Sequence, residues 1–307
     1  MTDAKLQQQP STAAEKHRRN LEELKLNILA GSSCTAFSVA VFNPLDTVRI
    51  RWQVATAEDR ALGIRGFARK VVANEGFVRG FWVPGCVAHS SAVAVSSGMR
   101  LGFYPTLRDL LAGDKDKSAF HMWLAGFSAG AVGFTIANPL FQAKVRLQVT
   151  AHMKQRPYAS MTDCLVKMAR EEGLPSLMRG SSTLMVRGAL LSAGAQLGYD
   201  YTKTEALRNG VEEGPLLHVV ASIASAFLAS TFSAPCDFIM TKYQAAPALG
   251  IRYNGIFDCV QQIVRQHGVL ELYKGWTPLF FRLAPLWTLN MPLYENVRKL
   301  MGLGYMT

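Results

Sequence analysis

The sequence predicts an all-α membrane protein whose six transmembrane helices come from three repeats of one unit. A motif that begins with proline occurs three times, at Pro44, Pro139 and Pro235, so that the copies lie 95 and 96 residues apart. A stretch rich in small residues recurs 13 residues before each proline. Only 18% of the 307 residues are charged and the mean hydropathy is +0.11, whereas a typical soluble domain carries about 25% charged residues.

Composition and motif content exclude or disfavour several classes of function. The net charge is +11, but no RNA-binding or zinc-finger signature accompanies it, so we expect the basic loops to meet lipid headgroups rather than nucleic acid. The chain has no G-x-x-x-x-G-K-(S/T), H-E-x-x-H or G-x-S-x-G motif, and its six histidines lie in different segments. Its five cysteines form no C-x-x-C pair, which favours packing roles in a reducing compartment. We therefore expect a protein that is not an enzyme and that uses no cofactor and no metal.

The first helix-length segment of each repeat carries the proline motif. Residues 1–21 are polar and predict a solvated tail rather than a secretory signal. The chain becomes apolar near Leu24, and small residues in each first segment would let membrane helices approach closely. Each proline lies inside such a segment, where it deletes one backbone hydrogen bond and kinks the helix. Charges follow two, five and seven positions later, and they are complete only in the first copy, as Asp46, Arg49 and Arg51.

A short amphipathic helix that ends at glycine is predicted after each first segment, over 64–76, 158–173 and 253–268. These helices are too short and too charged to cross a hydrocarbon layer about 30 Å thick, so we expect them at the membrane surface. A second apolar segment follows each of them, over 83–111, 177–207 and 275–300. The predicted organisation is a polar tail, three repeats and a short C-terminal end, over 1–21, 22–115, 116–211, 212–302 and 303–307.

The repeated motif resembles the signature of the mitochondrial carrier family, P-x-(D/E)-x-x-(K/R)-x-(K/R), followed by a short helix and an aromatic-basic-glycine turn such as Tyr273-Lys274-Gly275. The resemblance covers residues 22–302. It implies a six-helix barrel with pseudo-threefold symmetry around one central substrate site, in the mitochondrial inner membrane, with alternating access to the two sides. It also implies short helices on the matrix side, both termini toward the intermembrane space, a functional monomer, and cardiolipin among the lipids bound at the N-termini of the short helices.

Two salt-bridge networks gate such carriers, and the resemblance assigns residues of this chain to each. On the matrix side it implies two ion pairs, Asp46–Lys144 and Asp237–Arg49. The third pair is missing because Phe141 and Met240 stand at its two positions, and an apolar contact there costs less than a lone buried charge. Three glutamines, each nine residues after a proline, are expected to brace the ion pairs from below: Gln53, Gln148 and Gln244.

The second network lies at the cytoplasmic ends of the second segments, where an aromatic residue and an acid precede a base. The resemblance implies the pairs Asp200–Arg298 and Glu295–Arg108. Lys203 belongs to the same network, opposite Pro105. Each network would therefore keep two of its three bridges.

Two arginines lie at one depth in the second segments, seven residues after the motif glycines. An arginine deep in an apolar segment usually faces a water-filled cavity, and its guanidinium binds carboxylate or phosphate through two hydrogen bonds. Arg187 and Arg282 therefore predict an anionic substrate, although Ala92 takes the corresponding place in the first repeat. His89, near Ala92, is expected to have a packing role. Further candidate substrate-binding residues lie beside these positions or about eight residues beyond them: Arg100, Gly188, Gln196 and Asn290.

Residues 187–200, 99–104 and 282–285 resemble most closely the dicarboxylate and oxaloacetate carriers and the uncoupling proteins of this family. The leading hypothesis is therefore a transporter of small organic anions such as malate or oxaloacetate, with phosphate as a further candidate. Two alternatives stay open. One is a proton leak like that of an uncoupling protein, and the other is a carrier-fold scaffold or receptor that no longer transports.

Overall fold

The structure, a computed structural model, describes residues 13–112, 119–153, 156–210 and 214–300. Within these ranges the chain is helical and contains no strand. The helices that form its body are α1 (Ala13–Val41), α2 (Asn43–Gln53), α5 (Cys86–Ala112), α6 (Ala119–Thr150), α8 (Ser181–Arg208), α9 (Pro215–Ala245) and α11 (Trp276–Leu300). Shorter helices and single turns connect them: α3 (Ala57–Ala61), α4 (Gly63–Glu75), η1 (Val78–Trp82), α7 (Met161–Glu171), η2 (Leu174–Met178), η3 (Ala246–Leu249), α10 (Ile256–His267) and η4 (Val269–Tyr273).

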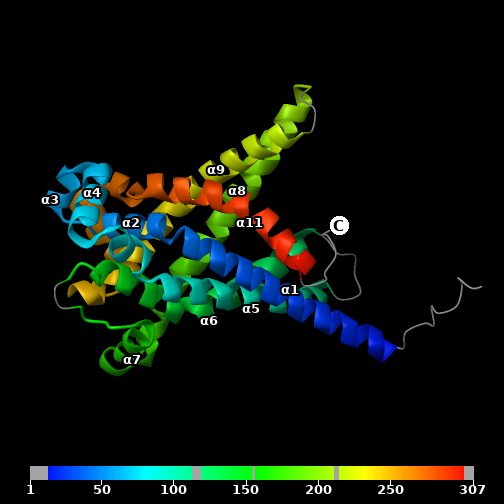
Figure 1. Cartoon of the computed structure of the whole chain (residues 1–307), viewed down its shortest axis with the longest axis horizontal. Coiled ribbons are helices and arrows are strands. Elements are labelled where there is room, and N and C mark those ends of the chain that lie inside the picture. Colours follow the sequence, from blue (N-terminus) through cyan, green and yellow to red (C-terminus); the bar gives the residue numbers. More distant parts are fainter. Residues whose placement is uncertain (1–12, 113–118, 154–155, 211–213, 301–307) are drawn as a thin grey trace, which may run out of the picture.

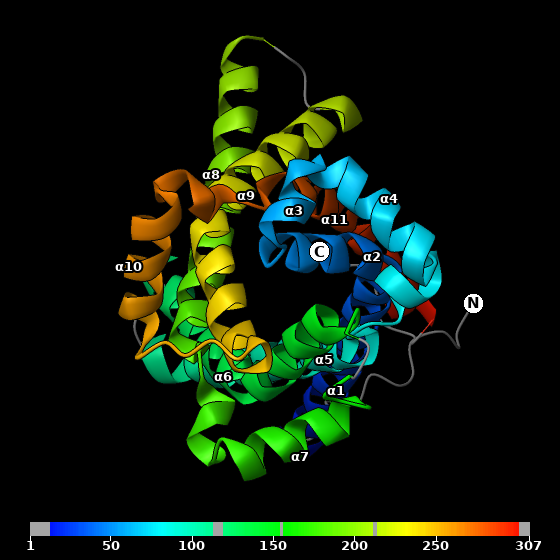
Figure 2. The ribbon, with the colours of Figure 1, turned by 90° about the vertical axis from the view of Figure 1, so that its left-hand side faces the viewer.

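The long helices converge at one end of the molecule and diverge toward the other (Figure 1). The short helices α3, α4 and α7 lie at the narrow end, whereas α1 begins and α11 ends at the wide end (Figure 1). Viewed from the narrow end, the helices form a ring, and α4, α7 and α10 lie around its rim (Figure 2). The three repeats therefore place equivalent elements at equivalent places around one axis.

The three prolines lie near the narrow end, two of them inside a long helix and one at the start of a short helix. Helices α6 and α9 run through Pro139 and Pro235 without interruption. At Pro44 the helix divides instead, because α1 ends at Val41 and α2 begins at Asn43. Pro44 thus occupies the first turn of a new helix, where its missing N–H costs no hydrogen bond. The charged residues two and five positions after the prolines are buried where these helices meet.

The three short amphipathic helices form as predicted, although two of them begin later than expected. Ser160 caps α7 by accepting a hydrogen bond from the Asp163 amide at 3.1 Å, so the residues from 158 to 160 form a turn instead of helix. The apolar face of α7 buries Cys164, and burial raises the pKa of this thiol to about 12. Burial likewise raises the pKa of Cys259 in α10 to about 11. Both side chains therefore stay neutral and act as small apolar packing residues.

Small residues bring neighbouring helices into backbone contact. A Cβ atom added at Gly198 in α8 would lie 2.7 Å from the backbone oxygen of Ala224 in α9. A Cβ atom at Gly133 in α6 would lie 2.6 Å from the backbone oxygen of Ser96 in α5. Because no side chain fits at such distances, these glycines fix the spacing of the pairs α8–α9 and α5–α6.

Three helical stretches in the described ranges are long and apolar enough to cross a membrane: Leu24–Val41, Leu124–Thr150 and Leu216–Leu249. They are the first segments of the three repeats. Helix α1 already begins at Ala13, within the range predicted as a polar tail. Alanine, glutamate and lysine near its start favour helix formation even where no apolar face is present.

Candidate functional site

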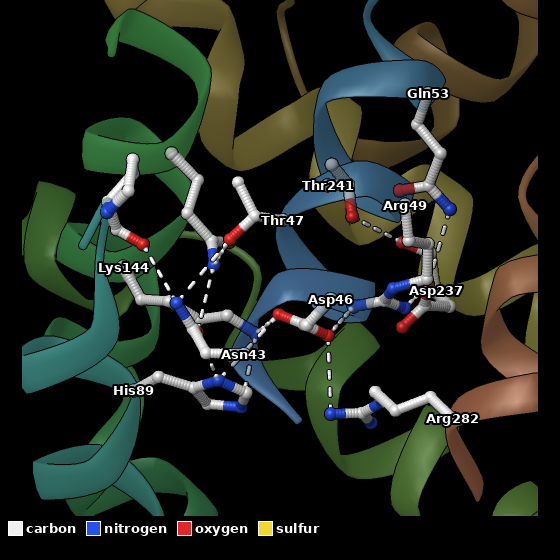
Figure 3. A network of polar contacts seen from close by, with 12 residues as sticks. Asn43, Asp46, Thr47, Arg49, Gln53, His89, Lys144, Asp237, Thr241 and Arg282 are labelled. Atoms are coloured by element: carbon white, nitrogen blue, oxygen red, sulfur yellow. Dashed lines mark hydrogen bonds and ion pairs between the residues drawn. The ribbon is translucent and has the colours of Figure 1, made fainter. Parts of the chain in front are cut away.

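Four charged residues of the proline motifs lie close together where helices from the three repeats meet (Figure 3). Asp46 and Arg49 come from α2, Lys144 from α6 and Asp237 from α9. All four side chains are buried, with at most 6% of each exposed. A cluster of ionised groups this deeply buried is stable only if each charge has a partner.

The two ion pairs expected from the sequence are present. The Lys144 ammonium lies 2.5 Å from Asp46 Oδ2, and the Arg49 guanidinium is bonded to Asp237. Arg49 also reaches Asp46 Oδ1 at 2.9 Å, so it connects both carboxylates. The helices α2, α6 and α9, one from each repeat, are therefore tied together at the narrow end.

The two arginines that are predicted to bind substrate form ion pairs with the same two carboxylates. Arg187 Nε on α8 lies 2.6 Å from Asp237 Oδ1, and Arg282 Nη1 on α11 lies 3.2 Å from Asp46 Oδ1. Arg282 is 8% exposed and Arg187 12%. The Nε atom of Arg282 has no hydrogen-bond partner among the described residues. We name the six residues the ion cluster: Asp46, Arg49, Lys144, Arg187, Asp237 and Arg282.

The apolar residues at the missing third pair lie in one buried cluster. Phe141 on α6 and Met240 on α9 pack together with Ala92, Ala137 and Leu184. At the narrow end, the first helices of the three repeats are therefore held together by two ionic contacts and one apolar contact. Ala92, which corresponds to Arg187 and Arg282 of the other repeats, is fully buried in this cluster.

The three glutamines occupy equivalent places, but only Gln53 hydrogen-bonds a described carboxylate of the ion cluster. Its amide lies 3.3 Å from Asp237 Oδ2. Gln148 donates to Thr47 Oγ1 at 2.9 Å, and Gln244 donates to Asn138 Oδ1 at 3.4 Å. The role of the three glutamines as braces beneath the ion pairs stays a prediction, and Gln148 and Gln244 contact neighbouring polar side chains. What the three share is contact with the glycine that precedes a second-segment helix: Gly275 beside Gln53, Gly85 beside Gln148 and Gly180 beside Gln244.

Two polar residues of the site were not identified from the sequence. The Asn43 amide donates to the backbone oxygen of Trp82 at 2.6 Å and of Pro84 at 3.2 Å, so it holds the turn before α5. Asn138 makes the equivalent contact with Leu177 at 2.8 Å. An asparagine directly before the proline in two repeats was the available signal.

His89 is a third polar residue of the site, and the expectation that it has a plain packing role is wrong. It is 3% exposed, but both of its ring nitrogens contact polar atoms. Nδ1 lies 3.3 Å from Asn43 Oδ1, and Nε2 lies 3.3 Å from Lys144 Nζ (Figure 3). The histidine therefore belongs to the polar network around the ion cluster.

The basic residue seven positions after each proline lies outside the ion cluster. Arg51 forms two hydrogen bonds with Glu75, at 2.6 and 3.0 Å, and so ties α2 to the end of α4. Arg146 makes the equivalent double contact with Glu172 after α7. In the third repeat His267 stands beside the glycine in place of the acid. Lys242, the corresponding base, lies over the Phe238 ring at 5.8 Å from its centre.

A cavity of about 460 Å³ lies between α5, α6 and α8. Three of the predicted substrate-binding residues line it: Arg100, Gly188 and Gln196. A Cβ atom at Gly188 would lie 2.7 Å from the Phe134 ring, so glycine is needed for the close approach of α8 to α6. The side chain of Asn290, the fourth candidate, lies outside the described residues.

The predicted network at the opposite end is only partly described. The side chains of Glu295 and Arg298 lie outside the described residues, so the pairs Asp200–Arg298 and Glu295–Arg108 stay predictions. Asp200 is exposed, and Arg108 and Lys203 are half-buried. All three lie toward the wide end, away from the ion cluster.

Comparison with known proteins gives three matches to the mitochondrial carrier protein family, over residues 22–115, 115–210 and 211–304. The probable mitochondrial 2-oxoglutarate/malate carrier protein of Dictyostelium discoideum is 28% identical over 287 residues, which cover 90% of this chain and 89% of that protein. The mitochondrial citrate transporter E of Aspergillus niger is 31% identical over 290 residues, covering 89% and 92%. The mitochondrial uncoupling protein 5 of Arabidopsis thaliana is 29% identical over 289 residues, covering 84% and 92%.

The family matches follow the same threefold division that the proline motif marks, and the similarity to these relatives extends over most of the chain. The all-helical architecture and the convergence of the three motifs agree with it. The chain belongs to the mitochondrial carrier family, whose members are transporters and not enzymes.

Proposed function

We propose that this protein exchanges small organic anions that carry two negative charges, such as malate, oxaloacetate or a related keto-dicarboxylate, across the mitochondrial inner membrane. The observation that carries the proposal is the charge of the ion cluster. Among the described residues its four cations contact two carboxylates, so the cluster carries two positive charges in excess. A dianion would neutralise this excess.

The geometry of the cluster also supports a mechanism. Arg187 and Arg282 are bound to the gate carboxylates Asp237 and Asp46 in this state. A dianion that enters from the wide end would compete for both guanidinium groups, because each forms strong paired bonds with carboxylate. Their release would weaken the contacts that hold the narrow end closed. The ion cluster would thus act as the matrix gate, and substrate binding would promote its opening.

The side cavity supports the size and polarity of this substrate class. Arg100 and Gln196 line it together with apolar residues of α6 and α8. We propose that Arg100 offers a third positive charge to the anion on its way to Arg187 and Arg282. Gly188 keeps the passage open between α6 and α8, because a larger residue would meet Phe134.

The proposed layout has six membrane spans, with the narrow end in the matrix and both termini toward the intermembrane space. The second-segment helices α5, α8 and α11 have 27, 28 and 25 residues. At 1.5 Å per residue each is roughly 38–42 Å long, which exceeds the hydrocarbon layer of about 30 Å. The described start of α1 and the end of α11 lie at the wide end (Figure 1), and we propose that the protein works as a monomer.

We further propose that cardiolipin binds between the starts of α5 and α7. A cavity of about 400 Å³ lies there, and its lining includes Arg79, Arg156, Gly85 and Ser160. Helix N-termini attract phosphate through their free N–H groups, and the two arginines add positive charge.

A liposome assay tests the proposed function. The purified protein is reconstituted, the liposomes are preloaded with one anion, and uptake of labelled anions is measured at pH 7. We expect exchange of malate, oxaloacetate and 2-oxoglutarate, slow exchange of phosphate, and little exchange of a monocarboxylate such as pyruvate or of ADP. No exchange across this panel, or preferred exchange of ADP, would overturn the proposal. Proton conductance without anion exchange would select the uncoupling alternative.

A further inference from the structure

His89 places a titratable group inside the closed gate, next to its only lysine. The imidazole is on α5, and charged side chains approach it from three other helices: Asp46 and Arg49 from α2, Lys144 from α6 and Arg282 from α11. Asp46 Oδ2 lies 3.7 Å from Nδ1, and Lys144 Nζ lies 3.3 Å from Nε2 (Figure 3). Neither ring nitrogen is left for water.

The hydrogen bonds fix which nitrogen carries the proton. The Asn43 amide nitrogen is occupied as a donor to backbone oxygens, so its Oδ1 is the atom that faces His89 Nδ1 and must accept. Nδ1 therefore carries hydrogen. The Lys144 ammonium can only donate, so Nε2 must accept from it. The closed gate thus holds a neutral histidine with both nitrogens bonded.

A second proton does not fit this arrangement. An N–H at Nε2 would point at the Lys144 ammonium, so that one hydrogen bond would be lost and two like charges would meet in a buried site. The ion cluster already carries two positive charges in excess, and a protonated His89 would add a third. Closure of the gate therefore requires that His89 be neutral.

We propose that His89 is a proton-binding site that exists only while the matrix gate is open, so that acidification on the matrix side holds the gate open and slows exchange. The inference rests on the proposed gating role of the ion cluster. When α2 separates from α6, Lys144 loses Asp46 and can turn to water, which frees Nε2. Proton binding to the open state alone then shifts the gate equilibrium by mass action.

The size of the shift follows from the ordinary pKa of histidine, about 6.5. Proton binding multiplies the population of the open state by one plus the ratio of the proton concentration to the acid dissociation constant. Between pH 7.5 and pH 5.5 this factor rises about tenfold. The open-to-closed ratio of the gate should rise by the same factor.

The variant His89→Gln tests the proposal, because glutamine offers a donor for Asn43 and an acceptor for Lys144 but does not titrate. His89→Asn offers the same pair of groups if His89→Gln fails to fold. His267→Gln, at the exposed end of α10, is the matched control. Malate exchange is measured in liposomes with equal pH on both sides, at pH 7.5 and 5.5. Comparison of variants with the same substrate cancels the titration of malate itself.

We expect exchange by the wild type and by His267→Gln to fall more on acidification than exchange by His89→Gln, by at most about tenfold, because the closed-gate population cannot fall by more than the rise in the open-to-closed ratio. Equal pH profiles for the wild type and His89→Gln would overturn the inference and leave the proposed function standing.

A second readout does not need transport. Spin labels at Arg69 on α4 and Glu171 on α7, both exposed, report the separation of the first and second repeats at the narrow end. The half-buried Cys86 and Cys236 are replaced by serine. Acidification should increase the fraction of wild-type molecules in which the two labels are far apart. The same fraction should not change in His89→Gln. If acidification changes the label distances only in the wild type but the protein exchanges no anion, the proton site stands and the proposed substrate class is wrong. If acidification changes the distances equally in both proteins, the proton site is wrong.

Discussion

Replacing Asp46 by asparagine is expected to reduce anion exchange by about 100-fold or more. Asp46 is fully buried and accepts from Lys144, Arg49 and Arg282. The neutral amide would leave these cations without a counter-charge in the closed state. Breaking a buried ion pair by removing one partner costs about 3–5 kcal/mol, and each 1.4 kcal/mol changes an equilibrium about tenfold. The gate would therefore seldom close, and the exchange cycle would stop with the matrix side open.

The matched control is Asp163→Asn, which removes a half-buried carboxylate at the start of α7, outside the ion cluster. Its exchange rate should stay near that of the wild type, since exposed ion pairs contribute at most about 1 kcal/mol. Asp46→Glu keeps the charge and should retain partial activity. Wild-type exchange by folded Asp46→Asn, measured by initial rates in liposomes, would contradict the gating role of this carboxylate.

Replacing Arg187 or Arg282 by alanine is expected to lower exchange by about 10- to 100-fold each. A hydrogen bond to a charged group contributes about 1.5–3 kcal/mol, and each arginine is proposed to hold one end of the dianion. Lysine at either position keeps the charge but cannot form the paired bonds of guanidinium, so it should restore only part of the activity. The rate and the KM for malate are measured for each variant.

Arg170→Ala on the exposed face of α7 is the control for these arginine variants. The double variant Arg187→Ala with Arg282→Ala should abolish exchange of dianions. Unchanged KM and rate in the single variants would show that substrate does not contact these arginines. Equal losses for Arg170→Ala would point to general destabilisation and would also contradict the assignment.

The main contacts of the site could be predicted from the repeated motif and its resemblance to the carrier family. The resemblance implied the pairs Asp46–Lys144 and Asp237–Arg49, and the repeat showed which residues occupy the paired positions. The replacement of both members of the third pair by Phe141 and Met240 was visible in the same way, and the two residues do share one apolar cluster.

Other contacts could not be predicted, because the sequence gives the depth of a residue in its helix but not the reach of its side chain. Arg187 and Arg282 were predicted to face a water-filled cavity and to bind substrate, yet they are nearly buried against Asp237 and Asp46, and these bonds depend on which end of the molecule is closed. Gln148 was expected, with the two other glutamines, to brace the ion pairs from below. Its hydrogen bond to the Thr47 hydroxyl and its place beside Gly85 depend on side-chain packing that the sequence does not give.

The polar role of His89 was not predicted, because the other two repeats have apolar residues at the equivalent position. The equivalent positions in the second and third repeats, four residues after the motif glycine, are Leu184 and Leu279. Both are buried apolar residues, so a packing role was the natural prediction for position 89. A polar residue at one of three otherwise apolar positions is a local departure from symmetry, and only the neighbouring Asn43 and Lys144 give it a role.

The central claim is that a dianion draws Arg187 and Arg282 away from the gate carboxylates and so opens the narrow end. Distances between spin labels at Arg69 and Glu171 test it most directly, measured at pH 7.5 with and without saturating malate. The account predicts that malate enlarges the long-distance population in the wild type and has no effect on the Arg187→Ala, Arg282→Ala double variant. An unchanged distribution in a wild-type protein that exchanges malate, or an equal response of the double variant, would contradict it.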